Sequence, residues 1–303
     1  MHLASNGGYI NFIYLQPLQE SCSLPFHHLS GAGVLSMKTY EAGDKLPDEY
    51  KKALIDLLAF QADSEFAGGQ RVEENMKYAT RPEEAYRLAK KVMEEMGHGW
   101  YCWEILAPLG IDVNARVQHL VQNRENPDPK KVRVINGFRK ENWAPLFECW
   151  ADVAMFSTAV TPAAVAFLGQ YRQSSYLPWA KVSERIWAEE KGHLAFGVWA
   201  AKRVMELDGD KGHEQLQAAV PKFMQIGLGF AGRPSDDSEH FARYFEYGLK
   251  IKTAQQIQDE YMEIVEKRLK EIGLEMPKNI EPNYDMRMGY AESKPLSAAG
   301  NKA

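Results

Sequence analysis

Hydrophobic positions recur with a period near 3.6 residues along most of the chain, whereas alternating, strand-like runs are scarce. The pattern predicts four long helices, at about residues 47–75, 80–108, 142–171 and 175–207. A shorter helix is expected from about residue 213, with a break at 227–232, and a last long helix at 235–272. Four long helices in two hairpins, followed by further helices, predict an all-α fold: a four-helix bundle with additional C-terminal helices.

Local signals indicate some helix boundaries. The segment Thr80-Arg81-Pro82-Glu83 provides a capping box with proline in the first turn of the second helix. Pro162 is expected to bend the third helix, because proline lacks a backbone donor and clashes with the preceding turn. The polar segment 123–131 contains two prolines and is expected to be a connection.

The two ends of the chain lack this helical pattern. Residues 1–36 are rich in Ser, Gly and His, carry Glu20 as their one charged residue, and do not begin with the basic stretch of a signal peptide. We expect 1–36 to be a disordered N-terminal extension, with Met37 as the natural start. The helical domain is expected to span 37–282, and 283–303 to form a flexible tail.

One short motif occurs twice, as Glu94-Glu95-Met96-Gly97-His98 and as Glu189-Glu190-Lys191-Gly192-His193. Each copy contains Glu-x-x-His, which places a carboxylate and an imidazole one turn apart on the same helix face. Such a pair can bind one metal ion while the carboxylate also reaches a second. A single Glu-x-x-His is expected by chance, but two copies in the same context on long helices are far more specific.

Both copies lie on the side of the helix that is expected to be buried. Their faces continue through apolar or small residues: Leu88, Val92, Cys102 and Ile105 in the first case, and Val182, Ile186, Gly197 and Val204 in the second. An ionised glutamate in a core is costly unless a partner compensates its charge, and a metal ion is the strongest such partner. Gly97 and Gly192 are unfavourable inside helices, so we expect each to allow a close approach.

A metal-binding bundle also needs carboxylates from its other two helices. Glu65 lies thirty residues before Glu95, a spacing that places the two side chains at the same height on the neighbouring helices of a hairpin. The same spacing before Glu190 falls near Thr161, where the chain has no acid. Two alternatives remain open for the sixth ligand: Asp152 in a different register of the third helix, or water or substrate beside Thr161.

Composition narrows the class of protein. The 303 residues have a formal net charge of −5, which gives no reason to expect nucleic acid as a partner. No run of about eighteen apolar residues is found, so no membrane span is expected. Cys22, Cys102 and Cys149 form no CxxC pair or disulfide framework, in keeping with a reducing cytoplasm.

Over residues 46–277 the chain resembles the catalytic subunits of ring-1,2-phenylacetyl-CoA epoxidases, which are ferritin-like di-iron monooxygenases. The similarity rests on five segments: Ser64-Glu65, Glu95 to Tyr101, Trp150-Ala151-Asp152, Glu190 to His193, and Lys270 to Pro277. It implies a ferritin-like fold with metal ligands at Glu65, Glu95, His98, Glu190 and His193. The family's remaining ligand is an aspartate that aligns with Thr161, and this alignment makes Asp152 a non-ligand.

The resemblance implies a di-iron (Fe) enzyme that inserts oxygen from O₂ into an aromatic acyl-CoA such as phenylacetyl-CoA. It also implies a homologous structural subunit, and therefore an oligomer. The chain has no GxGxxG motif for a flavin or nicotinamide, so electrons are expected from a separate reductase. Trp100, Tyr101 and Trp103 could line a substrate cavity, although such aromatics more often pack in a core. The competing hypotheses are a ferritin-like protein that oxidises metal and a non-catalytic structural subunit.

Overall fold

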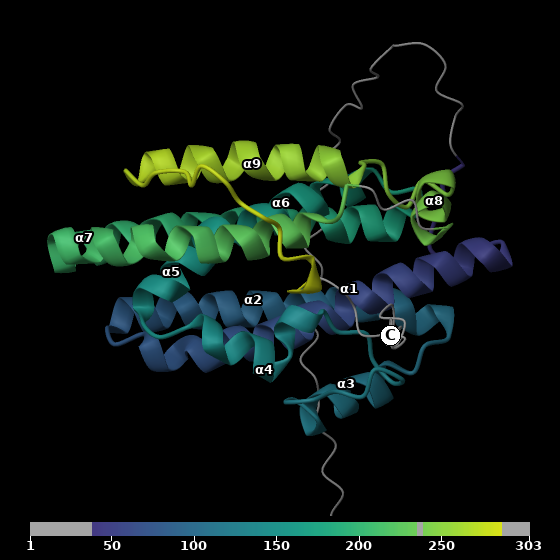
Figure 1. Ribbon diagram of the computed structural model, residues 1–303. Helices are drawn as coiled ribbons and strands as arrows, with labels where there is room; N and C mark the ends of the chain where they lie inside the picture. The colour runs from purple at the N-terminus through teal and green to yellow at the C-terminus, as the bar shows by residue number, and fades with distance from the viewer. Residues whose placement is uncertain (1–37, 235–238, 287–303) are drawn as a thin grey trace, which may run out of the picture. The chain divides into compact units, whose positions relative to one another are not determined.

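The computed structural model describes residues 38–234 and 239–286, which are largely helical (Figure 1). The longer helices are α1 (Asp48–Glu74), α2 (Pro82–Leu106), α3 (Val113–Gln122), α5 (Trp150–Ala159), α6 (Thr161–Gly169), α7 (Leu177–Ala231), α8 (Glu239–Glu246) and α9 (Ala254–Glu271). A single turn, α4 (Lys140–Trp143), and the 3₁₀ segments Asn75–Tyr78, Ala107–Leu109, Asn136–Phe138, Ala144–Leu146, Gln170–Gln173 and Tyr284–Met286 complete the elements. No strand occurs in the described residues, so the predicted all-α class is confirmed.

Four helical members form the bundle: α1, α2, the consecutive pair α5 and α6, and α7. Helix α1 packs along α2, and α5 and α6 pack along α7, which gives the two expected hairpins. Helix α2 also contacts α7, so the two Glu-x-x-His motifs lie on neighbouring helices. Helix α9 lies against α6 and α7 (Figure 1). The predicted ferritin-like bundle with additional C-terminal helices is confirmed.

The first hairpin follows the sequence prediction closely. Helix α2 begins one residue later than the predicted capping box implies, with Arg81 rather than Thr80 at the N-cap and Pro82 in the first turn. The Glu84 carboxylate accepts a hydrogen bond of 3.1 Å from the backbone N–H of Arg81. This contact performs the role that the sequence assigned to Glu83, because a first-turn acid satisfies the free N–H groups of a helix start.

The third long helix is shorter than predicted and is divided in two. It begins at Trp150 instead of about residue 142, because Phe147 and Cys149 are extended. The chain also leaves the regular helix at Val160, two residues before Pro162, where the predicted bend occurs. The Ala159 carbonyl accepts a hydrogen bond of 2.9 Å from the Tyr261 hydroxyl of α9, which compensates for the interrupted helix.

The second half of the chain differs more from the prediction. Helix α7 spans 55 residues but is interrupted at Gly209, whose φ of 56° and ψ of −133° are not helical, so the expected division between about residues 207 and 213 into two helices is confirmed. The predicted break at 227–232 was wrong, because the helix continues to Ala231. The glycines there instead permit close packing: a Cβ on Gly227 would lie 2.4 Å from the Ala159 oxygen. The predicted single helix 235–272 is two helices, α8 and α9.

Two further segments extend the picture given by the sequence. Helix α3 was not predicted; it starts where the Asp112 carboxylate accepts a 3.0 Å hydrogen bond from the N–H of Ala115. Residues 283–286, part of the predicted flexible tail, pack on the bundle, where the Asn283 N–H donates to the Gln225 carbonyl at 2.9 Å. The rest of that tail, the predicted extension 1–36 and the predicted start Met37 lie outside the described residues.

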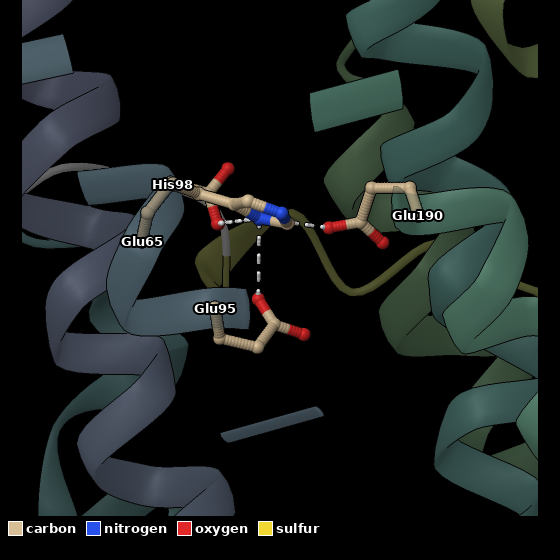
Figure 2. A group of neighbouring side chains, drawn as sticks. All are labelled: Glu65, Glu95, His98 and Glu190. Atoms are coloured by element: carbon tan, nitrogen blue, oxygen red, sulfur yellow. Dashed lines mark ion pairs between the residues drawn. The ribbon is translucent and has the colours of Figure 1, made fainter. Parts of the chain in front are cut away.

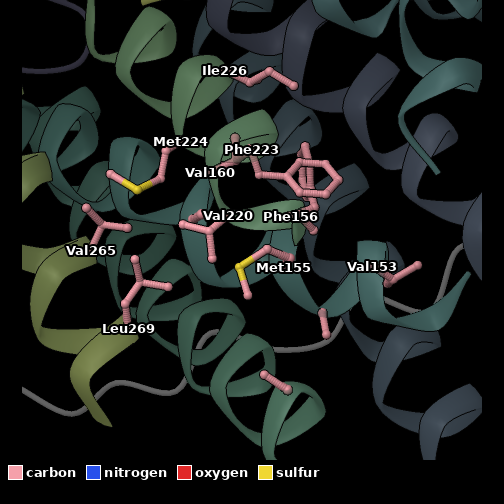
Figure 3. Packing of buried hydrophobic residues seen from close by; sticks show 14 of the residues in the cluster. Val153, Met155, Phe156, Val160, Val220, Phe223, Met224, Ile226, Val265 and Leu269 are labelled. Atoms are coloured by element: carbon pink, nitrogen blue, oxygen red, sulfur yellow. The ribbon is translucent and has the colours of Figure 1, made fainter. Parts of the chain in front are cut away.

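The largest hydrophobic cluster surrounds α5 and α6, which are covered by α7 and α9 (Figure 3). Residues 150–173 contain an 18-residue window with a mean hydropathy of 1.5, and are long and apolar enough to span a membrane by those measures. However, 89% of that window is buried within the protein. The composition of this segment is thus explained by packing on several sides at once.

The glycines of the two motifs do not have the role that the sequence suggested. An added Cβ at Gly192 would have no neighbour within 4 Å, and one at Gly97 would meet only the Tyr101 side chain of the same helix. The close approaches occur at Gly99, where a Cβ would lie 2.8 Å from the Ala62 oxygen, and at Gly197, where it would lie 2.6 Å from the Thr158 backbone nitrogen.

These two environments give opposite expectations for alanine substitutions in α7. Gly197→Ala should destabilise the protein by about 1–3 kcal/mol, because α5 and α7 must separate to admit a methyl group. Gly192→Ala, the matched control, should stabilise it by about 0.5–1 kcal/mol through helix propensity alone. Denaturant unfolding followed by circular dichroism measures both effects. Equal stability of the two variants would contradict the close α5–α7 packing.

Candidate metal centre

The five residues predicted as ligands come together inside the bundle. Glu65 projects from α1, Glu95 and His98 from α2, and Glu190 and His193 from α7. Figure 2 shows Glu65, Glu95 and Glu190 around the His98 ring, and ligand atoms of these four residues lie within 4.8 Å of one another. The ring centres of His98 and His193 are 5.6 Å apart. Three separate helices therefore supply one cluster of carboxylates and imidazoles.

Glu95 and Glu190 each face both imidazoles. Glu95 places Oε2 3.9 Å from the His98 Nδ1 atom and Oε1 3.3 Å from the His193 Nδ1 atom. Glu190 places Oε1 3.5 Å from the His98 Nδ1 atom and Oε2 3.4 Å from that of His193. Glu65 lies on the His98 side, 3.7 Å from its Nδ1 atom. This arrangement suits two metal ions, with one imidazole for each and two carboxylates able to bridge them.

The two Nδ1 atoms provide a test of whether the site fits a metal. Both are buried, and within residues 38–234 and 239–286 neither has a hydrogen-bond partner. A buried polar atom without a partner is costly and rare in a folded protein. Metal ions between the Nδ1 atoms and the carboxylates would satisfy both, so the donor set present here fits a pair of cations.

The first glutamate of each motif binds the histidine of the other motif. Glu189 lies 3.0 Å from the His98 Nε2 atom, and Glu94 lies 3.1 Å from the His193 Nε2 atom. Glu189 also accepts from Arg185 at 3.0 Å, and Glu94 pairs with Lys90. A carboxylate at Nε2 keeps the proton there and turns Nδ1 inward, which is how supporting groups orient metal-binding imidazoles. The repeated Glu-Glu doublet is the sequence signal for this contact.

The carboxylates shift the pKa of both imidazoles. Burial opposes protonation, but the hydrogen bond to Glu189 and the nearby Glu65 outweigh it and raise the pKa of His98 to about 10. Burial is likewise outweighed by Glu190 and Glu95, which raise the pKa of His193 well above its usual value. At neutral pH each metal-free imidazole therefore carries both ring protons. The Nδ1 proton must leave before that nitrogen can bind a metal.

Glu65 and Glu95, two of the glutamates that face these rings, differ in acidity. Burial raises the pKa of the Glu65 carboxyl, only partly opposed by His98. For Glu95, His193 and Lys91 outweigh the effect of burial and lower its pKa. A carboxylate that faces both imidazoles and a lysine is thus held in its ionised form, ready to bridge two cations.

Asp152 lies away from this cluster, at the start of α5. Its carboxylate accepts hydrogen bonds from the N–H groups of Glu148 and Cys149, at 2.9 and 3.2 Å, and pairs with Lys222 at 2.6 Å. These contacts make it a cap for α5, so of the two alternatives for the sixth ligand the geometry favours water or substrate. Thr161 lies beside the cluster and is 4% exposed.

A cavity of about 100 Å³ adjoins the cluster. Glu65, Glu95, Glu190 and Thr161 form its polar end, and the rest is largely apolar. The apolar wall of the cavity includes five phenylalanines: Phe60, Phe138, Phe156, Phe167 and Phe230.

The aromatic residues singled out by the sequence do not line the cavity. Trp103 is buried and donates to the Asp63 carboxylate at 3.2 Å, Trp100 is half exposed, and Tyr101 lies under the Arg185 guanidinium. The true lining comes from residues scattered from α1 to α7. No local sequence pattern marks them.

The contact between Glu189 and His98 leads to a prediction for metal affinity. Glu189→Gln should weaken metal binding about 10- to 100-fold, because an uncharged amide supports the Nε2 proton less well. Glu184→Gln removes the same charge from an exposed position of α7 and serves as the control. Competition titrations of Fe²⁺ or Co²⁺ against a chelator measure the affinity. Equal affinities for the two variants would show that Glu189 does not support the site.

The raised histidine pKa values lead to a prediction for pH. Because both imidazoles are protonated at neutral pH, metal loading at pH 7.5 should release about two protons per chain. Metal affinity should therefore rise with pH until the pKa of about 10 is passed. Proton release into a weakly buffered indicator solution measures this directly. Metal uptake without proton release would mean that the Nδ1 atoms are not the ligands.

Comparison with known proteins agrees with the geometry. The chain is similar to one subunit of the 1,2-phenylacetyl-CoA epoxidase from Escherichia coli (strain K12), with 26% identity over 254 residues that cover 82% of this chain and 76% of that protein. Residues 37–298 match the family described as phenylacetic acid catabolic protein. This match spans the whole bundle and every residue of the cluster. The chain therefore belongs to the phenylacetic acid catabolic protein family.

Proposed function

We propose that this protein is the catalytic subunit of a di-iron monooxygenase that inserts oxygen from O₂ into an aromatic acyl-CoA such as phenylacetyl-CoA. The observation that carries the proposal is the pair of buried Nδ1 atoms that lack hydrogen bonds to the described residues and face two shared carboxylates beside an apolar cavity. Family membership and the epoxidase named among its relatives support an oxidoreductase.

The donor set favours iron. The cluster offers three carboxylates and two imidazoles, and no thiolate of the described residues takes part. Mixed carboxylate and imidazole sites in helical bundles suit a pair of iron ions, and positions left open by the protein admit O₂. Bound there, the iron pair would supply the oxygen activation that no side chain can perform.

The side chains of the site have separable roles in this proposal. Glu65, Glu95, Glu190 and the two Nδ1 atoms bind the metals. Glu94 and Glu189 hold the Nε2 protons, so that both rings keep the orientation required for binding. The apolar wall excludes water from the reacting end of the cavity, which limits loss of oxidising equivalents to solvent.

The cavity supports an aromatic substrate. Its volume of about 100 Å³ is of the same order as that of an apolar cavity of about 150 Å³ that accommodates benzene. Five phenylalanine rings line it, and aromatic rings pack favourably against one another. A ring would lie in the apolar part, with the thioester end directed outward.

Partners complete the proposed enzyme. Because the sequence has no flavin or nicotinamide motif, a separate reductase would supply the electrons. The relative is named as one part of a larger enzyme, which supports assembly with other chains, and we propose that one of these is a homologous structural subunit. Free Cys102 and Cys149 fit a cytoplasmic location.

The proposal is tested in a single turnover. Iron-loaded protein is reduced chemically, mixed with O₂ and phenylacetyl-CoA, and the products are analysed by mass spectrometry. We expect about two iron ions per chain and a product heavier by one oxygen atom. Glu190→Ala, like Glu95→Ala, should lose the iron and the product together, whereas Glu184→Gln should keep both.

Other outcomes would identify the competing functions. A protein that binds no iron would have a purely structural role in the complex. A protein that binds and oxidises iron without modifying phenylacetyl-CoA or related acyl-CoA compounds would be a ferritin-like metal oxidase. Either result would contradict the proposed monooxygenase.

A further inference from the structure

The centre is asymmetric with respect to its two imidazoles. On the His98 side, Glu65 provides a carboxylate that faces only that ring. On the His193 side the described chain offers no equivalent acid, and the shared carboxylates Glu95 and Glu190 are the ones that reach its Nδ1 atom. Thr161 lines the cavity together with the shared carboxylates Glu95 and Glu190.

Lys91 lies beside Thr161 and is 2% exposed. Its ammonium group donates to the Ser157 hydroxyl at 3.2 Å and approaches the Thr161 hydroxyl at 3.5 Å. It also lies 3.6 Å from Oε1 of Glu95, the oxygen that faces His193. Because the Thr161 oxygen accepts from Lys91, its own proton remains for another acceptor. A cation and a hydroxyl donor therefore border the side that lacks a carboxylate.

The charges at the loaded centre would not balance. Two divalent ions bring four positive charges, and Lys91 adds a fifth, whereas Glu65, Glu95 and Glu190 provide only three negative charges. The outer glutamates contribute little, because Glu94 is paired with Lys90 and Glu189 with Arg185. Excess charge in a buried site is costly unless a counter-ion enters.

We propose that a carboxylate from solution completes the metal centre on the His193 side, where it binds beside Thr161 and Lys91 and offsets one of the two excess positive charges. The ligand class follows from the site: a singly charged anion with two oxygens can reach a metal ion and the Thr161 hydroxyl at once. The apolar cavity begins at the same place, so an aromatic carboxylate such as phenylacetate binds more tightly than acetate. This inference rests on the proposed metal centre.

Cobalt provides a readout that does not depend on turnover. Protein loaded with Co²⁺ is titrated with acetate and with phenylacetate, and binding is followed through the visible absorption of the metal. We expect saturable changes for both anions, with the lower dissociation constant for phenylacetate.

Variants of Thr161 and Lys91 test the proposed carboxylate site. Thr161→Asp supplies the missing carboxylate from the chain, so anion affinity should fall about tenfold or more while Co²⁺ binding is retained. Thr161→Val and Lys91→Gln, which add no charge, should also weaken anion binding about tenfold. Lys202→Gln removes an exposed lysine of α7 and should bind both anions as the unmodified protein does.

The outcomes separate the two proposals. One outcome is an unchanged anion affinity in Thr161→Asp and Thr161→Val while both proteins still bind about two Co²⁺ ions per chain. That result would overturn the proposed carboxylate site beside Thr161 and leave the metal centre intact. No anion response in the unmodified, fully loaded protein would do the same. Failure of the unmodified protein to bind Co²⁺ would overturn the metal centre itself, and this inference with it.

Discussion

The structure depends on the electrostatic balance of one buried cluster. Three carboxylates and two imidazoles occupy the interior of a helical bundle, where an uncompensated charge or a partnerless polar atom is costly. In the absence of metal, protons on both imidazoles offset part of the negative charge, as the raised pKa of His98 indicates. When metal ions are bound, the same Nδ1 atoms and carboxylates would hold cations instead. Metal binding would therefore be coupled to the loss of these protons.

The helices around the cluster hold it in register. Small residues bring the backbones close together, as at Gly99 between α1 and α2 and at Gly197 between α5 and α7. The exchange of contacts between the motifs, Glu189 with His98 and Glu94 with His193, ties α2 to α7 across the site. The Tyr261 hydroxyl compensates for the break before Pro162. That break leads directly into Thr161, so the irregular backbone also shapes the cavity.

Local sequence patterns were sufficient for much of this site, because its key pairs are local. The two residues of a Glu-x-x-His pair lie within one helical turn, and the thirty residues between Glu65 and Glu95 match the length of one helical hairpin. Helical periodicity was therefore enough to predict that these five side chains lie together. The resemblance to a known family agreed with those residues. Features that depend on packing between distant segments were not predictable. The cavity lining, the role of Lys91, helix α3 and the later start of α5 are of this kind.

The errors have physical causes as well. Gly97 and Gly192 were interpreted as sites of close approach because glycine is unfavourable in helices. However, Gly192 has free space around it, and a Cβ at Gly97 would meet only the Tyr101 side chain of the same helix. The glycines at 227–232 were interpreted as a helix break, but Gly227 admits the carbonyl of Ala159 into the packing of α7. Sequence alone cannot distinguish a glycine that ends a helix from one that lets a neighbour approach. Only the contacts of each position decide between them.

The central claim is that His98 and His193 each bind one metal ion through Nδ1, with Glu95 and Glu190 shared between the ions. Anomalous diffraction from crystals of the iron-loaded protein tests this most directly. The account predicts two iron peaks about 3.5–4 Å apart, one beside each Nδ1 atom. A single peak, or iron bound through Nε2 with Glu94 and Glu189 displaced, would contradict it.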